Sequence, residues 1–163
     1  EMTSMLDSYV SFVKTESPEP IETIIINELI GDIVKTVEKN GVELTIKEKN
    51  TIQTSGRQIQ LKRAFNNIID NSQRYAKKIE INLYINEKDC VIEFNDDGEG
   101  IPSNKYEDVF KPFFTLDPSR NKLKGESGLG LTITRDIIRS HGGDVKLSES
   151  NLGGLQLKVL LPL

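Results

Sequence analysis

The sequence predicts an α+β fold, a two-layer sandwich in which a mixed, mostly antiparallel sheet packs on three helices. Stretches with apolar residues at helical spacing are interspersed with shorter stretches of period two, and several of the latter follow one another in pairs joined by short turns. This order differs from the repeated strand–helix–strand units of a doubly wound parallel sheet. At 163 residues, 36 % of them hydrophobic, the chain is long enough for one packed domain with a short appendage.

The N-terminal residues 1–16 carry an apolar stripe at helical spacing, and Pro18 and Pro20 follow it. A helix of this length is marginal in water by itself, so we expect it to pack against another helix or chain and to continue from a longer protein. A linker over 17–22 then leads into the main domain, 23–163. The stripe consists of Met2, Met5, Leu6, Tyr9, Val10, Phe12 and Val13.

The main domain begins with a helix from Glu28 to Lys39, for which Asn27 is the expected N-cap and Asn40-Gly41 the expected stop. Later elements are bounded by glycine, asparagine and charged turns. In chain order they are strands at 42–47 and near 51–54, a long helix at about 58–75, strands at 78–86 and 89–95, a helix at about 129–140, and a closing hairpin of strands 145–148 and 155–161.

The charge and cysteine content exclude several classes of protein. Lys and Arg number 21 against 25 Asp and Glu, so the net charge of −4 lacks the basic footprint of a nucleic-acid-binding protein. The single cysteine, Cys90, excludes an internal disulfide framework and a cysteine-rich zinc site, and its strand-like setting predicts a buried structural thiol. No apolar run exceeds three residues, so we expect no membrane span in this sequence.

Three polar side chains recur along one side of the long helix. Asn67, Asn71 and Arg74 fall in a narrow stripe at about 100° per residue. Asparagine is a mediocre helix former, so two of them four residues apart need a reason. The stripe is either a solvated polar face or a row of amide oxygens facing a metal–phosphate group, because Mg²⁺ prefers oxygen ligands. The opposite, apolar positions are Leu61, Ala64, Phe65, Ile68, Ser72 and Tyr75.

Two glycine-rich turns follow in the chain. Asp96-Asp97-Gly98-Glu99-Gly100 comes directly after the strand 89–95, which alone is a weak signal because any tight turn uses such glycines. Residues 125–131, with the sequence Gly-Glu-Ser-Gly-Leu-Gly-Leu, open the helix that follows and offer free N–H groups to phosphate. The second turn is neither a Walker loop nor a dinucleotide fingerprint, because it lacks Gly-Lys-Ser/Thr and no parallel strand–helix–strand unit precedes it.

In order and spacing, these motifs resemble those of the bacterial sensor histidine kinases. The run 61–75 resembles their N box, and Asp96-x-Gly98-x-Gly100 resembles their first glycine box. The similarity covers about residues 20–163, and residues 1–16 resemble the end of the second helix of the preceding dimerization domain. Within the family the chain most resembles osmosensor kinases of the EnvZ type. The remaining matches are an F box at Phe110-Lys111-Pro112-Phe113-Phe114, a second glycine box at Gly128-Leu129-Gly130-Leu131 and a closing glycine box at Gly153-Gly154.

This resemblance implies the catalytic domain of the GHKL ATPase superfamily, which binds ATP and Mg²⁺. Asn71 would be the Mg²⁺ ligand, Asn67 would face the phosphates, and Asp96 would accept a hydrogen bond from the adenine amino group. A mobile ATP lid would span about 115–127, where Glu126, like Leu155 near the end of the chain, departs from the family pattern. The other residues implied in ATP binding are Arg74, Tyr75, Gly98, Gly100, Ile101, Arg120, Lys122, Lys124, Gly128, Leu129, Gly130 and Leu131.

The same fold serves gyrase, MutL and the ninety-kilodalton heat-shock chaperones, so the reaction depends on the site. Those ATPases resemble one another in a glutamate one turn before the metal-binding asparagine, and serine-kinase anti-sigma factors also tend to carry an acid there. Here that position is Asn67, whose amide cannot act as a general base. Asp70 is about 100° around the helix from Asn71. These residues favour a kinase that holds ATP for an external histidine over a hydrolase.

The acceptor histidine is expected outside this chain. The single histidine, His141, lies in Ser-His-Gly-Gly at a helix C-terminus and lacks the Glu-x-x-Thr-Pro context of a phosphoacceptor, so a structural role is expected. The implied partners are an upstream dimerization domain, a response regulator and a second copy of the parent protein. The domain would lie in the cytoplasm, with the parent anchored in the bacterial inner membrane. A non-catalytic nucleotide-binding module of a degenerate kinase remains the alternative.

Overall fold

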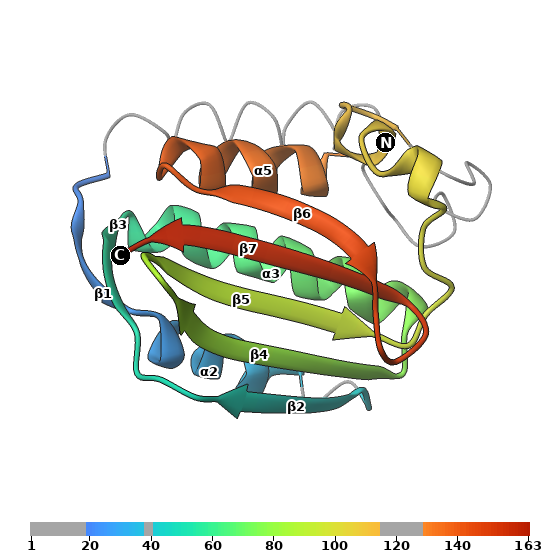
Figure 1. Cartoon of the computed structure of the whole chain (residues 1–163), viewed down its shortest axis with the longest axis horizontal. Coiled ribbons are helices and arrows are strands. Elements are labelled where there is room, and N and C mark those ends of the chain that lie inside the picture. The colour runs from blue at the N-terminus through green and yellow to red at the C-terminus, as the bar shows by residue number, and fades with distance from the viewer. Residues whose placement is uncertain (1–18, 38–40, 115–128) are drawn as a thin grey trace.

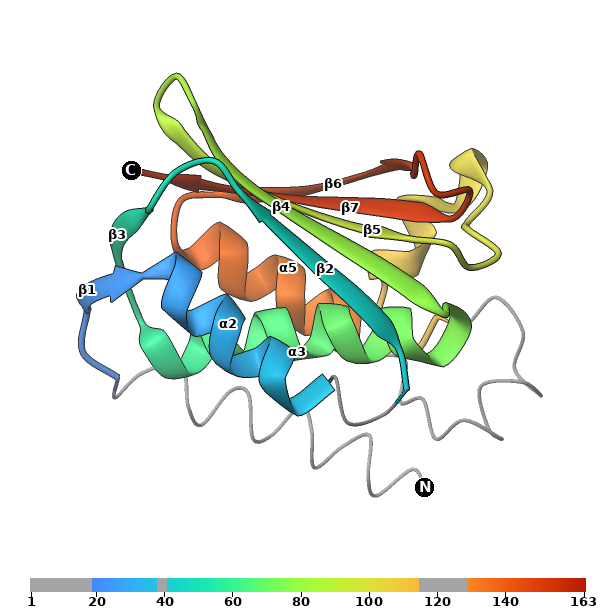
Figure 2. The same ribbon diagram turned by 90° about the horizontal axis from the view of Figure 1, so that it is seen from below.

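The computed structural model describes residues 19–37, 41–114 and 129–163. The expected N-terminal helix at 1–16 and the expected lid at 115–127 lie outside these ranges. The described part confirms the α+β class: one layer is a sheet and the other is a set of helices on one of its faces (Figures 1 and 2). Among the described helices, none is long and apolar enough to cross a membrane.

The main sheet has five strands in the order β2-β4-β5-β7-β6. Strand β2 (Glu43–Glu48) pairs in parallel with β4, and the other neighbours pair antiparallel. The two predicted hairpins are confirmed, with Leu83 opposite Ile92 in one and Leu147 opposite Leu157 in the other. The strands are β4 (Lys78–Asn86), β5 (Asp89–Asp96), β6 (Asp144–Glu149) and β7 (Leu155–Pro162).

A separate two-stranded sheet joins the start of the domain to the start of the long helix. Strand β1 (Glu22–Ile25) pairs antiparallel with β3 (Gln53–Gly56). Strand β3 lies two residues later than the strand predicted near 51–54. Strand β1 has no counterpart in the prediction, because four residues at a domain entrance are too few to show a periodic pattern.

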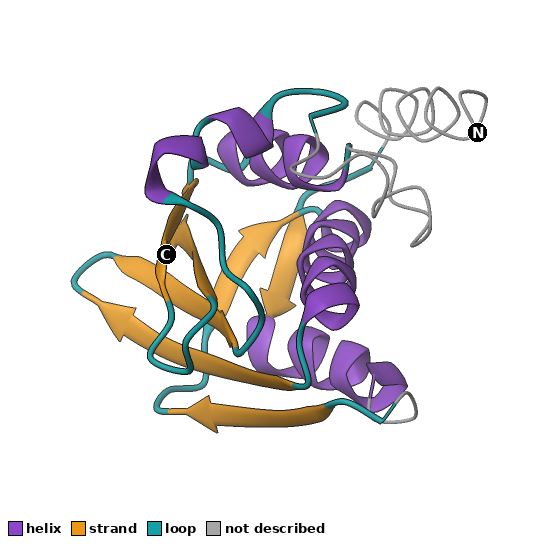
Figure 3. Ribbon diagram, turned by 90° about the vertical axis from the view of Figure 1, so that its right-hand side faces the viewer, coloured by secondary structure: helices purple, strands orange, loops and turns teal. Residues whose placement is uncertain are grey.

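Three α-helices cover one face of the five-stranded sheet: α2 (Ile26–Val37), α3 (Gln58–Tyr75) and α5 (Gly130–Ser140) (Figure 3). Asn27 is not the N-cap that the sequence predicted, because α2 already begins at Ile26. The Asn27 amide instead accepts the N–H of Ile52 at 2.7 Å and donates to the carbonyl of Asn50 at 2.9 Å. It therefore fixes the chain between β2 and β3 against the first turn of α2.

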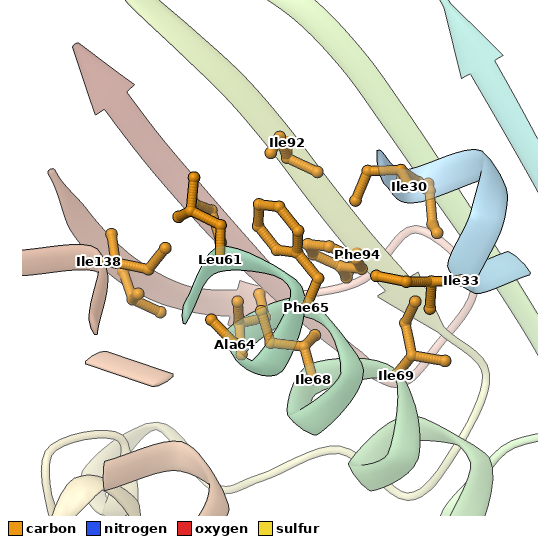
Figure 4. Packing of buried hydrophobic residues seen from close by; sticks show 14 of the residues in the cluster. Ile30, Ile33, Leu61, Ala64, Phe65, Ile68, Ile69, Ile92, Phe94 and Ile138 are labelled. Atoms are coloured by element: carbon orange, nitrogen blue, oxygen red, sulfur yellow. The ribbon is translucent and has the colours of Figure 1, made fainter. Parts of the chain in front are cut away.

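The core fills the space between the helices and the sheet (Figure 4). Phe65 on α3 lies with its ring centroid 6.1 Å from that of Phe94 on β5, and both side chains are buried. Ile30 and Ile33 of α2 and Ile138 of α5 complete this layer. Burial of such side chains is worth about 1.5–3 kcal/mol each, so the core fixes α3 and α5, which carry the predicted site, firmly on the sheet.

Candidate functional site

The polar stripe of α3 lies at the edge of the helix layer rather than in open solvent. Asn67, Asn71 and Arg74 are all partly buried, whereas the apolar positions on the other side of the helix enter the core. The amide nitrogen of Asn67 donates to the carbonyl of Gly130, with 3.5 Å between the two atoms. A Cβ on Gly130 would lie 4.0 Å from the Cβ of Asn67, so two predicted motifs meet here.

The carboxylate of Asp96 is buried at the end of β5 and is held by backbone groups. Its Oδ1 accepts the N–H of Gly98 and the N–H of Leu155, each at 3.0 Å, and the Ser72 side chain also hydrogen-bonds the carboxylate. Desolvation by burial is the largest effect on Asp96 and raises its pKa, although these three hydrogen bonds oppose the shift. The buried carboxylate is thus fixed in one orientation.

The glycines beside Asp96 are required by close approaches of backbone. A Cβ on Gly98 would lie 2.9 Å from the carbonyl oxygen of Tyr75, which places the first glycine box against the end of α3. A Cβ on Gly154 would lie 2.1 Å from Asp96 Oδ1. Gly100 has a φ of +74°, in the left-handed region that glycine adopts readily, and a Cβ there would meet Gly154 at 3.5 Å.

Asp97, next to the buried carboxylate, has a different role. Its Oδ1 accepts the N–H of Lys77 at 2.8 Å and the N–H of Lys78 at 2.9 Å. The Lys78 hydrogen bond is the largest effect on Asp97 and lowers its pKa. Asp97 therefore stabilises the turn between α3 and β4, whereas Asp96 beside it remains the candidate for base recognition.

The start of α5 forms the third side of the site. Leu129 is fully buried, and the Thr134 hydroxyl donates to the carbonyl of Gly130 at 2.8 Å. The same hydroxyl lies 3.4 Å from the carbonyl of Ala64 on α3. The first turn of α5 therefore lies close to α3, and the N-terminal end of α5 is next to Asn67, where a helix N-terminus favours phosphate.

The predicted F box packs onto α5 at its first residue. Phe110 closes a short 3₁₀ helix (Asp108–Phe110), and its carbonyl accepts the hydroxyl of Thr132 at 2.7 Å. The guanidinium of Arg135 lies 4.2 Å from the Phe110 ring centroid and pairs with Glu107 at 3.1 Å. Phe113, three residues later, is half exposed and has a φ of +64°, an uncommon conformation for a bulky residue.

The structure brings Asn67 of α3 against Gly130 at the start of α5, and Tyr75 at the end of α3 against Gly98, beside Asp96 and Gly100. Asn71 and Arg74 lie between Asn67 and Tyr75 on α3, and Ile101, Leu129 and Leu131 are chain neighbours of Gly100 and Gly130. Arg120, Lys122, Lys124 and Gly128 lie outside the described residues. Sequence reasoning missed Ser72 and Leu155 as supports of Asp96. A hydroxyl among the apolar positions of α3 was the available signal for Ser72, whereas a backbone N–H such as that of Leu155 leaves no trace in a sequence.

The residues present fit Mg²⁺ bound together with phosphates. Asn71 is partly buried on the same side of α3 as Asn67, which lies one turn away, and an amide oxygen is a suitable ligand for a hard cation. The described chain holds no cluster of three acidic, histidine or cysteine ligands. Such a site matches Mg²⁺, which commonly takes one or two protein ligands and fills its other positions with substrate phosphates and water.

His141 and Cys90 occupy the structural positions that the sequence predicts. The Nε2 atom of His141 accepts the N–H of Arg57 at 3.0 Å, so the ring proton is on Nδ1, which lies 2.8 Å from the carbonyl of Ile137. Cys90 is fully buried, and desolvation together with nearby Asp89 raises the pKa of its thiol to about 12. Neither side chain lies among the residues of the candidate site.

The comparisons with known proteins agree with this geometry. Residues 56–163 match the model of the family described as histidine kinase-, DNA gyrase B-, and HSP90-like ATPase. The chain belongs to this family. It is 34 % identical to the sensor histidine kinase CpxA of Escherichia coli over 148 residues. This match covers 87 % of this chain and 32 % of CpxA. It is 31 % identical over 149 residues to the sensor histidine kinase GtrS of Pseudomonas aeruginosa, covering 91 % of this chain and 30 % of GtrS.

Solved structures confirm the fold of a histidine-kinase catalytic domain. The mycobacterial sensor histidine kinase MprB matches with a TM-score of 0.76 and 25 % identity, over 88 % of this chain and 97 % of that one. The ATP binding domain of PrrB from Mycobacterium tuberculosis matches with a TM-score of 0.74 and 22 % identity, over 88 % of this chain and 98 % of that one. The chain spans about a third of the length of the curated relatives CpxA and GtrS.

Proposed function

We propose that this domain binds Mg-ATP and presents its γ-phosphoryl group to a histidine of an upstream dimerization domain, from which the group passes to a response regulator. The observation that carries the kinase assignment is Asn67, one turn before the metal-ligand candidate Asn71. An amide at this position cannot take a proton from water, and its nitrogen is already bonded to Gly130. The hydrolases of the same fold carry a water-activating carboxylate at this position. In this chain the amide of Asn67 takes its place and would face the phosphates.

Asp70 does not substitute for that carboxylate. It is exposed on α3, about 100° around the helix from Asn71. Desolvation raises its pKa, and the charge of nearby Arg74, one turn later on the helix, opposes the shift. The site therefore favours retention of ATP until an acceptor arrives over rapid hydrolysis.

The chain's own residues divide the task of binding. The buried carboxylate of Asp96 would accept the adenine amino group, and Gly98 and Gly100 leave space for the base beside the backbone. Asn71 would hold Mg²⁺ with the phosphates, Asn67 would contact the phosphates, and the α5 N-terminus would donate N–H groups. When bound, the metal neutralises charge on the phosphate oxygens. Arg120, Lys122 and Lys124 are proposed to reach the γ-phosphate from the lid.

The parent protein is proposed to be a dimeric sensor kinase anchored in the bacterial inner membrane, with this domain in the cytoplasm. Residues 1–16 would be the end of its second dimerization helix, and 17–22 the linker. The curated relatives CpxA and GtrS are named sensor histidine kinases, and the domain covers about a third of their length, which leaves room for further domains in the parent.

Calorimetric titration with a non-hydrolysable ATP analogue tests the site. Asn71→Ala should weaken Mg-dependent binding by tenfold or more, about 1.4 kcal/mol, because it removes the proposed metal ligand. Asn66→Ala is the matched control, since Asn66 lies on the same helix, is also partly buried, and is about 140° around the axis from Asn71. Equal affinities for both variants, or equal affinities for the ATP and GTP analogues in the wild type, would contradict the site assignment.

A further inference from the structure

The linker before β1 is fastened to the first turn of α3 by one side chain. The Glu19 carboxylate accepts the N–H of Ile59 through Oε2 at 2.5 Å and the N–H of Gln60 through Oε1 at 3.1 Å. The main-chain carbonyl of Glu19 also accepts the Nε–H of Arg57 at 3.2 Å. Glu19 therefore accepts two adjacent main-chain N–H groups in the first turn of α3 and one side-chain N–H from the N-cap residue Arg57.

This carboxylate replaces a local cap. The N-cap residue Arg57 makes no side-chain capping hydrogen bond. Free N–H groups at the start of a helix need an acceptor, and a negative charge there also interacts favourably with the helix dipole. Glu19, about 40 residues earlier in the chain, supplies both. The start of the N-box helix thus depends on the position of the linker.

Helix α3 is in turn tied to α5 at several levels, so the two helices are expected to move together. Beside the Glu19 contact, Arg57 donates its N–H to His141 at the C-terminal end of α5. At mid-helix, the Thr134 hydroxyl lies 3.4 Å from the carbonyl of Ala64, and further along the Asn67 amide donates to the carbonyl of Gly130. The two helices therefore run antiparallel, with the linker at one end of the pair and the nucleotide site toward the other (Figure 2).

Distance does not prevent such coupling, because a helix packed on a sheet is stiff. At 1.5 Å per residue, Asn67 lies about 12 Å and Asn71 about 18 Å along α3 from Ile59. Two hydrogen bonds to adjacent N–H groups restrain both the axial position and the rotation of the helix. A small shift at the first turn would move the α3–α5 pair as a unit and so change the separation of Asn67 and Asn71 from Asp96, which lies on the sheet.

We propose that Glu19 is a positioning residue that couples the linker to the nucleotide site: with its carboxylate seated on α3, the α3–α5 pair holds the arrangement that binds Mg-ATP. The inference rests on the proposed function, since it concerns the same site. A movement of the upstream helices that pulls Glu19 away would lower nucleotide affinity, and bound nucleotide would in turn favour the seated linker, because coupling is reciprocal.

Glu19→Ala in the full 163-residue chain tests the proposal. The dissociation constant for Mg-ATP analogue should rise about fivefold, the low end of typical coupling between sites, at a temperature well below unfolding of every variant. Glu22→Ala, an exposed glutamate three residues later, should stay within twofold of the wild type. A lowered unfolding temperature for Glu19→Ala with unchanged nucleotide affinity would reduce Glu19 to a helix cap and overturn the proposal.

Amide hydrogen exchange in the nucleotide-free protein separates this inference from the proposed function. In Glu19→Ala, exchange should accelerate from the first turn of α3 through Asn71 and at the start of α5. Acceleration confined to residues 59–61 would overturn the coupling. A wild type that binds no ATP analogue would refute the proposed function, and the exchange pattern would still decide whether Glu19 positions the two helices.

Discussion

The burial of the Asp96 carboxylate lowers the stability of the folded protein, but it suits the residue to recognition of the adenine base. A carboxylate enclosed by Ser72, Gly98 and Leu155 loses its water, which raises its pKa. The folded protein therefore binds more protons than the unfolded chain between the ordinary carboxyl pKa and the raised value. The contribution of Asp96 to the free energy of unfolding therefore falls as the pH rises through that window. At neutral pH, where the carboxylate is ionised, its burial lowers the stability of the fold. Perturbed carboxyls of this kind are typical of binding sites.

Asp96→Asn should separate these two effects. The amide oxygen can still accept the N–H groups of Gly98 and Leu155, so thermal unfolding at pH 7 should show stability equal to or above that of the wild type. Affinity for ATP should fall by tenfold or more, because the amide has no charge and offers one acceptor oxygen in place of two. In the wild type, affinity should fall on acidification at a pH above the ordinary carboxyl range. Loss of folding in the variant, with affinity per folded molecule retained, would contradict this assignment.

At the scale of elements, His141 joins the end of α5 to the start of α3. Gly56 allows this contact, since a Cβ there would lie 2.9 Å from the imidazole Cδ2. The ring satisfies the N–H of Arg57, which the helix itself leaves unpaired, and the carbonyl of Ile137. The residue is thus part of the helix layer, and a histidine between two helix ends need have no chemical role.

His141→Ala should lower the free energy of unfolding by about 1–3 kcal/mol, the cost of leaving a partly buried backbone donor without an acceptor. Urea denaturation measures this directly. The neighbouring Arg139→Ala is the control: it removes an exposed ion pair with Asp144 at 3.2 Å, and such surface pairs contribute about 0–1 kcal/mol. Equal losses for the two variants would show that the His141 hydrogen bonds contribute nothing beyond a surface contact.

At the scale of the whole molecule, long periodic elements were predictable and short ones were not. The helix 58–75 and the strand 78–86 match α3 and β4 to the residue, because 18 and 9 residues give a clear pattern. The two-stranded sheet was not predicted, since β1 has four residues and its partner β3 lies nearly 30 residues away. Tertiary contacts also determine the role of Asn27, whose side chain accepts a hydrogen bond from the β2–β3 connection instead of capping its own helix.

The candidate site divides in the same way. Side chains within motifs, such as Asn67, Asn71 and Asp96, were identified from residue type and order. The groups that support them are mostly backbone atoms, namely the N–H of Leu155 and the carbonyls of Gly130 and Tyr75, which every residue type carries. The role of Glu19 was not predictable for a related reason. Its carboxylate oxygens accept N–H groups of a helix that begins about 40 residues later, and no local sequence pattern connects Glu19 with that helix.

The phosphoacceptor histidine is proposed to lie outside this chain, in the upstream dimerization domain of the parent protein. This chain should bind ATP without taking up phosphate, because His141 is engaged at both ring nitrogens and lies away from the site. A helical fragment carrying the parent's acceptor histidine should be phosphorylated in trans, but slowly, since the effective concentration given by the tether is lost. Labelled ATP followed by neutral gel electrophoresis measures both, with Asn71→Ala as the negative control.

Label on this chain alone, abolished by His141→Gln, would refute the external acceptor. Absence of transfer at every fragment concentration, with ATP binding intact, would favour a non-catalytic nucleotide-binding module.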